Sequence, residues 1–180
     1  MNLKGSQTER NLFKTFAGES RARNKYTFYA EKARDDGFLY VAEVFEATAG
    51  NEKAHAREVF RRYLDRINNT KNNLIESALS ESEESKVIYK EFEEIAREEG
   101  FDDIADFYKE LQEVEEHHKE RFLDLAKKLK EGKMFKSDRE EEWICLNCGY
   151  IYEGKEAPMK CPLCRYPRAY FRRLCNEDCK

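Results

Sequence analysis

Proline, cysteine and tryptophan are absent from the first 142 of the 180 residues. The three Pro, the six Cys and the single Trp all lie at or after Trp143. The missing Pro leaves the first part free to form long uninterrupted helices, and the missing Cys excludes a disulfide-stapled fold there. The part after Trp143 is loop-rich and too short to be stable without a metal. We expect a helical domain over residues 1–135, a linker over 136–142 and a small metal-stabilised domain over 143–180.

A large excess of one charge and a long apolar run are also absent. Charged residues make up 39% of the chain, yet the formal net charge is only −4, so the one-sided basic patch of a nucleic-acid-binding protein is not expected. The sequence has no membrane-length apolar segment, and its first ten residues lack the apolar core of a signal peptide. Cysteine pairs in such a chain indicate a reducing cytoplasm, where thiols bind metals rather than form disulfides.

Four long amphipathic helices account for the first domain. Ser6-x-x-Glu9 is a capping box that predicts the start of the first helix. Gly37, Gly100 and Gly132 predict where the first, third and fourth helices stop, and an Asn-rich stretch is expected to break the second. The predicted helices span residues 6–36, 38–68, 74–99 and 102–131.

Carboxylates and histidines occupy the helix faces that should be buried. Glu52-x-x-His55 recurs as Glu115-x-x-His118, and a carboxylate precedes each copy by about one antiparallel helix. Glu19 precedes the first copy in this way, and both Glu81 and Glu84 precede the second. A buried, unpaired carboxylate is strongly destabilising, and no Lys lies on these stripes to form an interior salt-bridge network. The pattern indicates bound cations shared by all four helices.

The ligand types favour a pair of iron ions. Carboxylate oxygens with one imidazole per metal suit iron or manganese better than thiolate-preferring metals, and bridging carboxylates hold two ions about 3.5–4 Å apart. We assign Glu19 and His55 to one ion, Glu81 or Glu84 and His118 to the other, and Glu52 and Glu115 to both. Glu81 and Glu84 share a helix face, so an extra ligand would let one iron change its coordination with its oxidation state.

Three tyrosines and one further histidine lie near these ligands in the sequence. Tyr26, Tyr29 and Tyr89 are candidates for hydrogen bonds to ligand carboxylates or to bound peroxide, although ordinary core packing explains each of them equally well. His117 has Val114 three residues before it and leaves the stripe. We expect His117 to be an ordinary solvated histidine.

A second metal site follows from the cysteine spacing. Two C-x-x-C pairs separated by twelve residues hold one tetrahedral ion; they are formed by Cys145, Cys148, Cys161 and Cys164. A structural zinc ribbon has the same geometry, so the spacing indicates a metal and leaves zinc and iron open. Shielding by Trp143, Tyr150, Tyr152 and Phe171 would suit an iron that changes charge. Cys175 and Cys179 are expected to be exposed and without a role.

Several motifs match one family. They are Ala17-Gly-Glu-Ser-x-Ala-Arg-Asn-x-Tyr26, Asn51-Glu-Lys-x-His55-Ala, Ile95-Ala-Arg-Glu-Glu-Gly100, Glu115-Glu-x-His118, Cys-x-x-Cys-Gly-Tyr and Cys-Pro-x-Cys. In these residues, over nearly its whole length, the chain resembles the rubrerythrins. The resemblance implies a mainly α fold, a ferritin-like four-helix bundle followed by a small rubredoxin-like metal-binding domain with four cysteine ligands.

The resemblance also implies the cofactors, which are two Fe in a carboxylate-bridged centre and one Fe in the four-cysteine site. Carried over by motif, the di-iron ligands are Glu19, Glu52, His55, Glu81, Glu84, Glu115 and His118. In the third helix, Ser80-Glu-Ser-Glu-Glu84 departs from the usual Gly-Glu-x-x-Glu. The carboxylates of that helix are therefore less securely assigned than the two Glu-x-x-His pairs.

The function that the resemblance implies is a peroxidase that reduces hydrogen peroxide to water in oxidative-stress defence. The di-iron centre would give two electrons to peroxide. The cysteine-ligated iron would return them one at a time, ultimately from NAD(P)H through a partner reductase or rubredoxin. Two alternatives stay open, namely a ferroxidase or oxygen reductase, and an iron-handling protein with a structural zinc ribbon.

Connection lengths predict a homodimer. In the ferritin-like topology the second and third helices run parallel, so their connection must climb the bundle. An extended link from Ile67 to Leu74 spans at most about 25 Å, against roughly 28 Å needed. We therefore expect a domain-swapped dimer, in which each site combines the first two helices of one chain with the last two of the other.

The rest of the fourth helix after His118 carries the chain about 16–20 Å from its own di-iron site before Cys145 is reached. This distance favours a head-to-tail arrangement that brings each cysteine-ligated iron near the partner's di-iron site.

Overall fold

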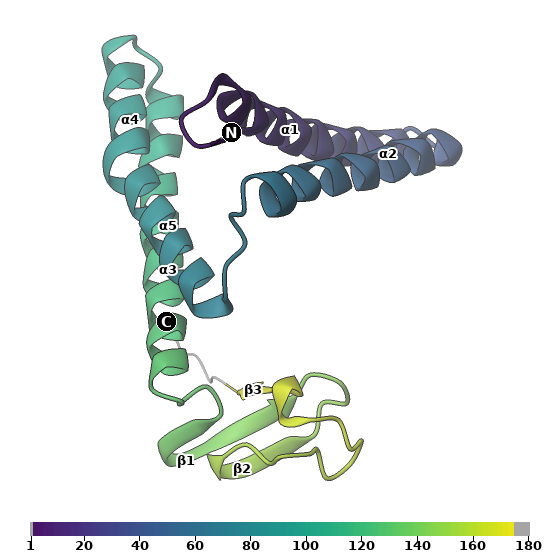
Figure 1. Cartoon of the computed structure of the whole chain (residues 1–180), viewed down its shortest axis with the longest axis vertical. Coiled ribbons are helices and arrows are strands. Elements are labelled where there is room, and N and C mark those ends of the chain that lie inside the picture. The colour runs from purple at the N-terminus through teal and green to yellow at the C-terminus, as the bar shows by residue number, and fades with distance from the viewer. Residues whose placement is uncertain (1, 175–180) are drawn as a thin grey trace. The chain divides into compact units, whose positions relative to one another are not determined.

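The structure, a computed structural model, describes residues 2–174 (Figure 1). Over these residues the chain is mainly α-helical, with four long helices followed by a small sheet. It forms two compact units that divide between Asn68 and Asn69, and each is described by itself. In the described part of the chain, no helix combines the length and apolar character needed to cross a membrane. Cys175 and Cys179 lie outside the described residues.

The first unit is a pair of packed helices, α1 (Gln7–Asp35) and α2 (Leu39–Glu58) (Figure 1). Ser6 is the N-cap of α1, and its hydroxyl accepts a hydrogen bond from the Glu9 N–H at 3.0 Å. The Glu9 carboxylate in turn accepts from the Gly5 N–H at 2.6 Å. These two bonds satisfy backbone donors that the first helical turn leaves free. The predicted start of the first helix is therefore confirmed.

The second helix ends earlier than the sequence predicts. After Glu58 the chain enters a π-helical turn, η1 (Val59–Tyr63), and leaves the helix there rather than near residue 68. Asp65 has a left-handed backbone, with φ of 49°, and the Arg66 N–H donates to the Phe60 carbonyl at 3.0 Å. This closure satisfies a terminal carbonyl and stops the helix. The predicted extension of the helix to residue 68 is therefore wrong.

The third helix begins earlier than the sequence predicts. Asn69 accepts a hydrogen bond from the Asn72 N–H at 3.0 Å and is the N-cap of α3 (Thr70–Glu83). Asparagine is among the strongest N-capping residues because its side chain satisfies a free donor of the first turn. The Asn-rich stretch, which was expected only to break the second helix, therefore also starts the third.

The third long helix contains a π-helical turn. It passes from α3 through η2 (Glu84–Ile88) into α4 (Tyr89–Glu98). After a short turn, α5 (Asp102–Lys130) packs against α3, η2 and α4. The bounds of α5 agree with the predicted fourth helix, whereas neither π turn was predicted.

The two helical hairpins share one turn structure. Gly37 and Gly100 both have φ of 82°, a left-handed conformation that glycine adopts without a steric penalty. In each turn the N–H of the next residue donates at 2.8 Å to the carbonyl five residues back. The sequence separation of the two glycines equals that of Glu52 and Glu115. The turns therefore set the two Glu-x-x-His motifs at equivalent positions of their hairpins.

Small side chains fill the helix contacts, while many large apolar side chains stay uncovered. The buried apolar residues of α1, α2, α3, α4 and α5 are Ala30, Ala33, Ala42, Ala49, Ala56, Ala78, Ala96, Ala105 and Ala126. In contrast, Phe28 is 62% exposed, Leu79 68% and Phe107 55%. Uncovered apolar surface of this kind marks an interaction face.

The C-terminal part is an antiparallel three-stranded sheet with the order β2-β1-β3. Its strands are β1 (Lys136–Cys145), β2 (Ile151–Glu156) and β3 (Phe171–Arg173), and a short 3-10 turn, η3 (Arg168–Tyr170), precedes β3. Trp143 is fully buried at the centre of this sheet, and its indole N–H donates to the Gly154 carbonyl at 2.7 Å. A tryptophan that buries its ring and satisfies its N–H gives the small sheet a core.

Residues 136–142, which the sequence predicts to be a linker, form the first part of β1. Lys136 pairs with Glu156 across the sheet, and their side chains form an ion pair at 3.5 Å. The strand is irregular between Lys136 and Glu141, so its exposed charged residues do not alternate as in a regular strand. This irregularity explains why a charged run was mistaken for a linker.

The hairpin turns lead to a first prediction. Gly100→Ala should lower the free energy of unfolding by about 1 kcal/mol, because an L residue is strained at positive φ. No atom lies within 4 Å of the added Cβ, so a steric clash does not contribute. Gly50→Ala is the matched control, since Gly50 is an exposed helical glycine whose added Cβ also meets nothing within 4 Å. Urea unfolding should show that Gly50→Ala raises stability by up to about 1 kcal/mol; equal effects of the two substitutions would contradict the argument.

Candidate metal centres

Two carboxylates and one imidazole meet on the α1–α2 pair. Glu19 comes from the middle of α1, and Glu52 and His55 come from α2, about one helical turn apart. The His55 Nδ1 lies 3.1 Å from Glu52 Oε2 and 3.5 Å from Glu19 Oε2. One ligand atom of each residue lies within 4.8 Å of the other two. We name these three residues the first half-site.

The charges of the first half-site require compensation. A hydrogen bond with Glu52, together with burial, raises the pKa of Glu19, and the same bond lowers the pKa of Glu52. The hydrogen bond to Glu52 raises the pKa of His55. These shifts reflect the crowding of negative groups in the first half-site, which a bound cation would stabilise.

The second half-site, Glu81, Glu115 and His118, has the same composition. His118 Nδ1 lies 2.7 Å from Glu115 Oε2 and 3.7 Å from Glu81 Oε2, and the three ligand atoms again lie within 4.8 Å of one another. Burial and the neighbouring Glu115 raise the pKa of Glu81. The His55 and His118 side chains are 61% and 44% exposed, so each half-site lies on an open face of its own hairpin.

Glu84 stands apart from the second half-site. Its carboxylate accepts a hydrogen bond from the Tyr89 hydroxyl at 3.1 Å, and the group of Glu81, Glu115 and His118 does not include it. Of the three candidate tyrosines, Tyr89 is therefore the one that the structure bonds to a predicted ligand. The negative charge of Glu84 still contributes to raising the pKa of Glu81, so the two carboxyl groups are near neighbours.

Tyr26 and Tyr29 pack against Phe45 instead, with ring centroids 6.1 and 5.6 Å away. In the second hairpin Tyr108 takes the place of Phe45, with Tyr89 and Phe92 at 5.9 and 5.4 Å. Neither central ring was among the predicted site residues. Each lies seven residues before the Glu of a Glu-x-x-His motif, two helical turns away on the same face, and this spacing was the available signal.

The four predicted thiols converge in the C-terminal sheet. Cys145 and Cys148 lie at the end of β1 and in the following turn, and Cys161 and Cys164 form the second knuckle. The Sγ atoms of Cys145 and Cys164 are 3.7 Å apart, as are those of Cys148 and Cys161. A tetrahedral ion with metal–sulfur bonds of about 2.3 Å has sulfur–sulfur edges of about 3.8 Å. The thiol positions therefore fit one tetrahedral metal ion.

The thiols differ in acidity. The backbone N–H of Tyr150 acts to lower the pKa of Cys148, but desolvation and the three neighbouring sulfurs outweigh it and raise that pKa to about 12. For Cys164, desolvation acts to raise the pKa, and the Tyr166 N–H and the Asn147 amide outweigh it and help to lower the pKa to about 6. The raised pKa of Cys148 reflects its three sulfur neighbours, and a bound cation would favour the thiolate form of the group.

Aromatic side chains bury two of the four thiols, whereas Cys148 is exposed and Cys164 is half-buried. Cys145 and Cys161 are 1% and 0% exposed, and they belong to one buried cluster with Trp143, Ala157 and Phe171. Tyr150 and Tyr152 pack against this cluster. The expected shielding is therefore present on the side of Cys145 and Cys161, where it would lower the polarity around an ion that changes charge.

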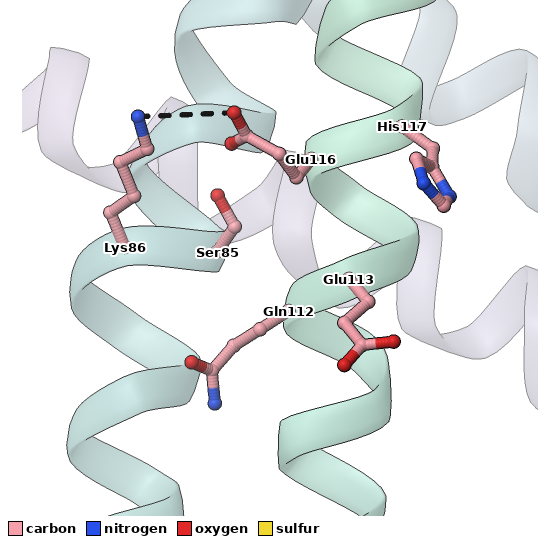
Figure 2. A pocket seen from close by; sticks show the side chains of 6 residues that line it. All are labelled: Ser85, Lys86, Gln112, Glu113, Glu116 and His117. Carbon is pink, nitrogen blue, oxygen red and sulfur yellow. Dashed lines mark ion pairs between the residues drawn. The ribbon is translucent and has the colours of Figure 1, made fainter.

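A hollow between η2 and α5 is separate from these ligand groups. It is lined by Ser85, Lys86, Gln112, Glu113, Glu116 and His117 (Figure 2). Ion pairing with Lys119, helped by Lys86, lowers the pKa of Glu116, which supports a structural role for this acid. Figure 2 shows His117 on the side of α5 away from Lys86, and it belongs to neither metal-binding group.

The donor sets identify the metals by class. Two carboxylates and one imidazole in each half-site suit a hard ion such as iron, while four thiolates suit iron or zinc. Two such half-sites on long helices, together with a thiolate site in a small sheet, define a di-iron carboxylate protein with a rubredoxin-like domain.

Comparisons with known proteins agree with this class. The family model described as rubrerythrin matches residues 10–126 and 72–144, and that of the rubrerythrin rubredoxin-like domain matches 143–172. A rubrerythrin of Nitratidesulfovibrio vulgaris is 41% identical over 96% of this chain and 97% of its own. A putative rubrerythrin of Methanocaldococcus jannaschii is 39% identical over 98% and 96%. The chain belongs to the rubrerythrin family.

Among solved structures, a partially reduced state of nigerythrin is 30% identical to the chain. The alignment covers 93% of this chain and 86% of nigerythrin, with a TM-score of 0.37.

The adjacent histidines of α5 offer a test of the half-sites. His118→Ala should lose iron from the di-iron centre, because it removes the only imidazole of the second half-site. Iron analysis after reconstitution should show that the cysteine-ligated iron is retained. His117→Ala is the matched control on the same helix and should bind iron as the unaltered protein does. Equal iron loss in the two variants would contradict the assignment.

Proposed function

We propose that the chain is a peroxidase that reduces hydrogen peroxide to water, with electrons from a reductase or rubredoxin that draws on NAD(P)H. The observation that carries the proposal is the thiolate cage, with its 3.7 Å sulfur spacings, on the same chain as two carboxylate–imidazole half-sites. When bound, the iron ions supply two-electron chemistry at one site and one-electron transfer at the other. Thiolate ligands of this kind need a reducing compartment, which supports a cytoplasmic location.

The protein's own residues would position and shield these sites. Glu52 and Glu115 are the carboxylates nearest to the imidazoles of their half-sites, at 3.1 and 2.7 Å, and they would bridge the two ions. The aromatic groups around Phe45 and Tyr108 cover the helices two turns before each Glu-x-x-His motif. In the assembled centre, rings at this position would limit the access of water.

Helix bounds support the proposed exchange of hairpins between two copies. In a ferritin-like bundle the two half-sites lie at the same height on parallel helices. His55 is eight residues, or about 12 Å, above Tyr63, and Thr70 is eleven residues, or about 16 Å, above Glu81. Within one chain, the connection would have to climb about 28 Å.

The available connection is much shorter than this. The hydrogen bond from the Arg66 N–H to the Phe60 carbonyl closes the end of the second helix, and Asn69 caps the third. Four residue steps remain between Arg66 and Thr70, which reach at most about 14 Å. Each di-iron centre therefore combines the first half-site of one chain with the second half-site of another, in a domain-swapped homodimer. A head-to-tail arrangement would also bring the four-cysteine site of each chain near a di-iron centre of its partner.

The oxidant can be tested by anaerobic stopped-flow absorbance. Fully reduced, iron-loaded protein is mixed with one equivalent of hydrogen peroxide and, separately, with dioxygen, while the red colour of the oxidised cysteine-ligated iron is followed. We expect rapid return of the colour with peroxide and slow return with dioxygen. The reverse order would favour an oxygen reductase or ferroxidase. A chain that never develops the colour would hold zinc in the four-cysteine site and would favour an iron-handling role.

The exchange of hairpins can be tested by complementation. His55→Ala disables the first half-site and His118→Ala disables the second, so neither variant alone forms a complete centre. In a swapped heterodimer of the two variants, one site pairs both defects and the other pairs both intact half-sites. The purified heterodimer, isolated by two different affinity tags, should therefore bind iron at one of its two di-iron sites. A heterodimer without any intact centre would exclude the exchange.

A further inference from the structure

The two cysteine knuckles share one backbone form but differ in one side chain. Gly149 follows Cys148 with φ of 75°, and Arg165 follows Cys164 with φ of 64°. The N–H of each donates to the carbonyl of the first cysteine of its knuckle, at 2.8 and 3.0 Å. Glycine adopts this left-handed backbone without strain, whereas an L residue does not. The fold alone therefore does not account for an arginine at this position.

The charges on the segments that form the knuckles and β3 are all positive. Residues 144–152 contain no charged side chain, and residues 157–174 contain five Lys and Arg but no Asp or Glu. Two of these five cations are paired, Arg168 with Glu156 at 2.6 Å and Arg173 with Glu141 at 4.0 Å. The acidic residues of the sheet thus neutralise only part of this positive charge.

The other three cations are exposed, and within residues 2–174 their side chains form no ion pair; they are Lys160, Arg165 and Arg172. Each of the three is close to a cysteine in the chain or in the sheet. Lys160 precedes Cys161 and Arg165 follows Cys164. Arg172 pairs across the sheet with Ile144, the residue before Cys145. The positive charge is therefore concentrated around the thiolate site.

Exposed apolar side chains accompany the less buried sulfurs. Cys148 is exposed and Cys164 is half-buried. Leu146 and Leu163, one in each knuckle, are 60% and 67% exposed, and uncovered apolar side chains of this kind mark an interaction face. We name these four residues, together with Arg165, the knuckle face.

The knuckle face gives a protein partner access to the thiolate site. Cys145 and Cys161 are buried with Trp143 and Phe171, so a partner cannot touch them, whereas the sulfur of Cys148 lies at the surface. An apolar centre with a rim of one charge suits a brief encounter between redox proteins, because the rim speeds association and the small contact lets the partners separate.

We propose that the knuckle face is the docking surface for an acidic one-electron donor protein, with the Arg165 guanidinium meeting a carboxylate of that donor. The donor loses one electron, the metal ion held by the four thiolates gains it, and no bond forms or breaks. Two exposed leucines are far less than the roughly 800 Å² that each partner of a stable interface buries, so a second copy of the chain is the less suitable occupant. The inference rests on the proposed function, which requires an external donor, and is independent of the oxidant.

The rate at which the cysteine-ligated iron is reduced tests the proposal. Oxidised, iron-loaded protein is mixed anaerobically with reduced flavodoxin, an acidic one-electron donor protein, and the loss of the red colour is followed by stopped-flow absorbance. Arg165→Gly should lower the second-order rate constant about 3- to 10-fold at low salt. This difference should disappear at about 0.5 M salt, where the attraction is screened. Because glycine relieves the backbone strain, the variant should unfold at the same or a higher temperature, so misfolding would not explain a slower reaction.

Two controls separate docking from a changed metal site. Lys155→Gln removes an exposed cation from the end of β2 remote from Cys145 and should leave the rate unchanged. Reduced methyl viologen, a small cationic donor, should reduce Arg165→Gly at least as fast as the unaltered protein. A slower reaction with both donors would assign Arg165 to the reduction potential and overturn the proposal, as would an unchanged rate with flavodoxin or an equal loss in Lys155→Gln. No peroxide is present, so failure of this test and failure of the peroxidase proposal are distinguishable.

A binding measurement does not require iron. In a nuclear magnetic resonance titration of the zinc-loaded protein with flavodoxin, the backbone N–H signals of residues 146–149 and 163–166 should shift. The shifts should be smaller in Arg165→Gly at the same flavodoxin concentration. If a second copy of the chain covers the knuckle face, these signals will not respond to flavodoxin, and that result would overturn the proposal.

Discussion

Repulsion between clustered carboxylates is the constraint on which the helical part of this protein depends. Each half-site holds two carboxyl groups with ligand atoms within 4.8 Å of each other and of an imidazole. Two like charges about 4 Å apart repel by about 4 kcal/mol at an effective dielectric constant of 20. This repulsion contributes to the raised pKa of Glu19 and of Glu81. A bound dication would relieve it, provided that the long helices and their matched turns hold all the ligands at the same position along the bundle.

The C-terminal domain meets the same constraint with sulfur. Four thiolates, of which two pairs lie 3.7 Å apart, would repel one another, so an ion that balances their charge would also hold the small sheet together. Buried Trp143 and Phe171 keep water from two of the sulfurs, which suits a centre that gains and loses one electron. Such a centre is useful to a two-electron site only across a short distance. Because α5 continues for twelve residues beyond His118 before the sheet begins, we propose that a partner chain supplies that proximity.

The spacing of residues in the sequence predicted the features that lie within one regular helix. It did not predict the π turns, where the helical register changes. Ser6 and the two hairpin glycines fixed helix ends because caps act locally. The Glu-x-x-His pairs stood out because carboxylates on a buried face contradict the hydrophobic pattern. Both π turns were missed, since one additional residue leaves the 3-4 spacing on each side intact. The strand over residues 136–142 was missed because its exposed charges resemble those of a linker.

Equivalent positions of the two hairpins are separated by a constant number of residues. This separation reveals an additional residue that helical periodicity alone does not show. Equivalent turns and equivalent Glu-x-x-His motifs obey this separation, so the single deviation at Glu81 requires an additional residue nearby. A helix accommodates such a residue only by locally widening its turn, and the widened turn changes which side chains face each other. The pair formed by Glu84 and Tyr89 is therefore a direct consequence of the insertion. Two hairpins whose half-sites have the same composition thus differ at this point.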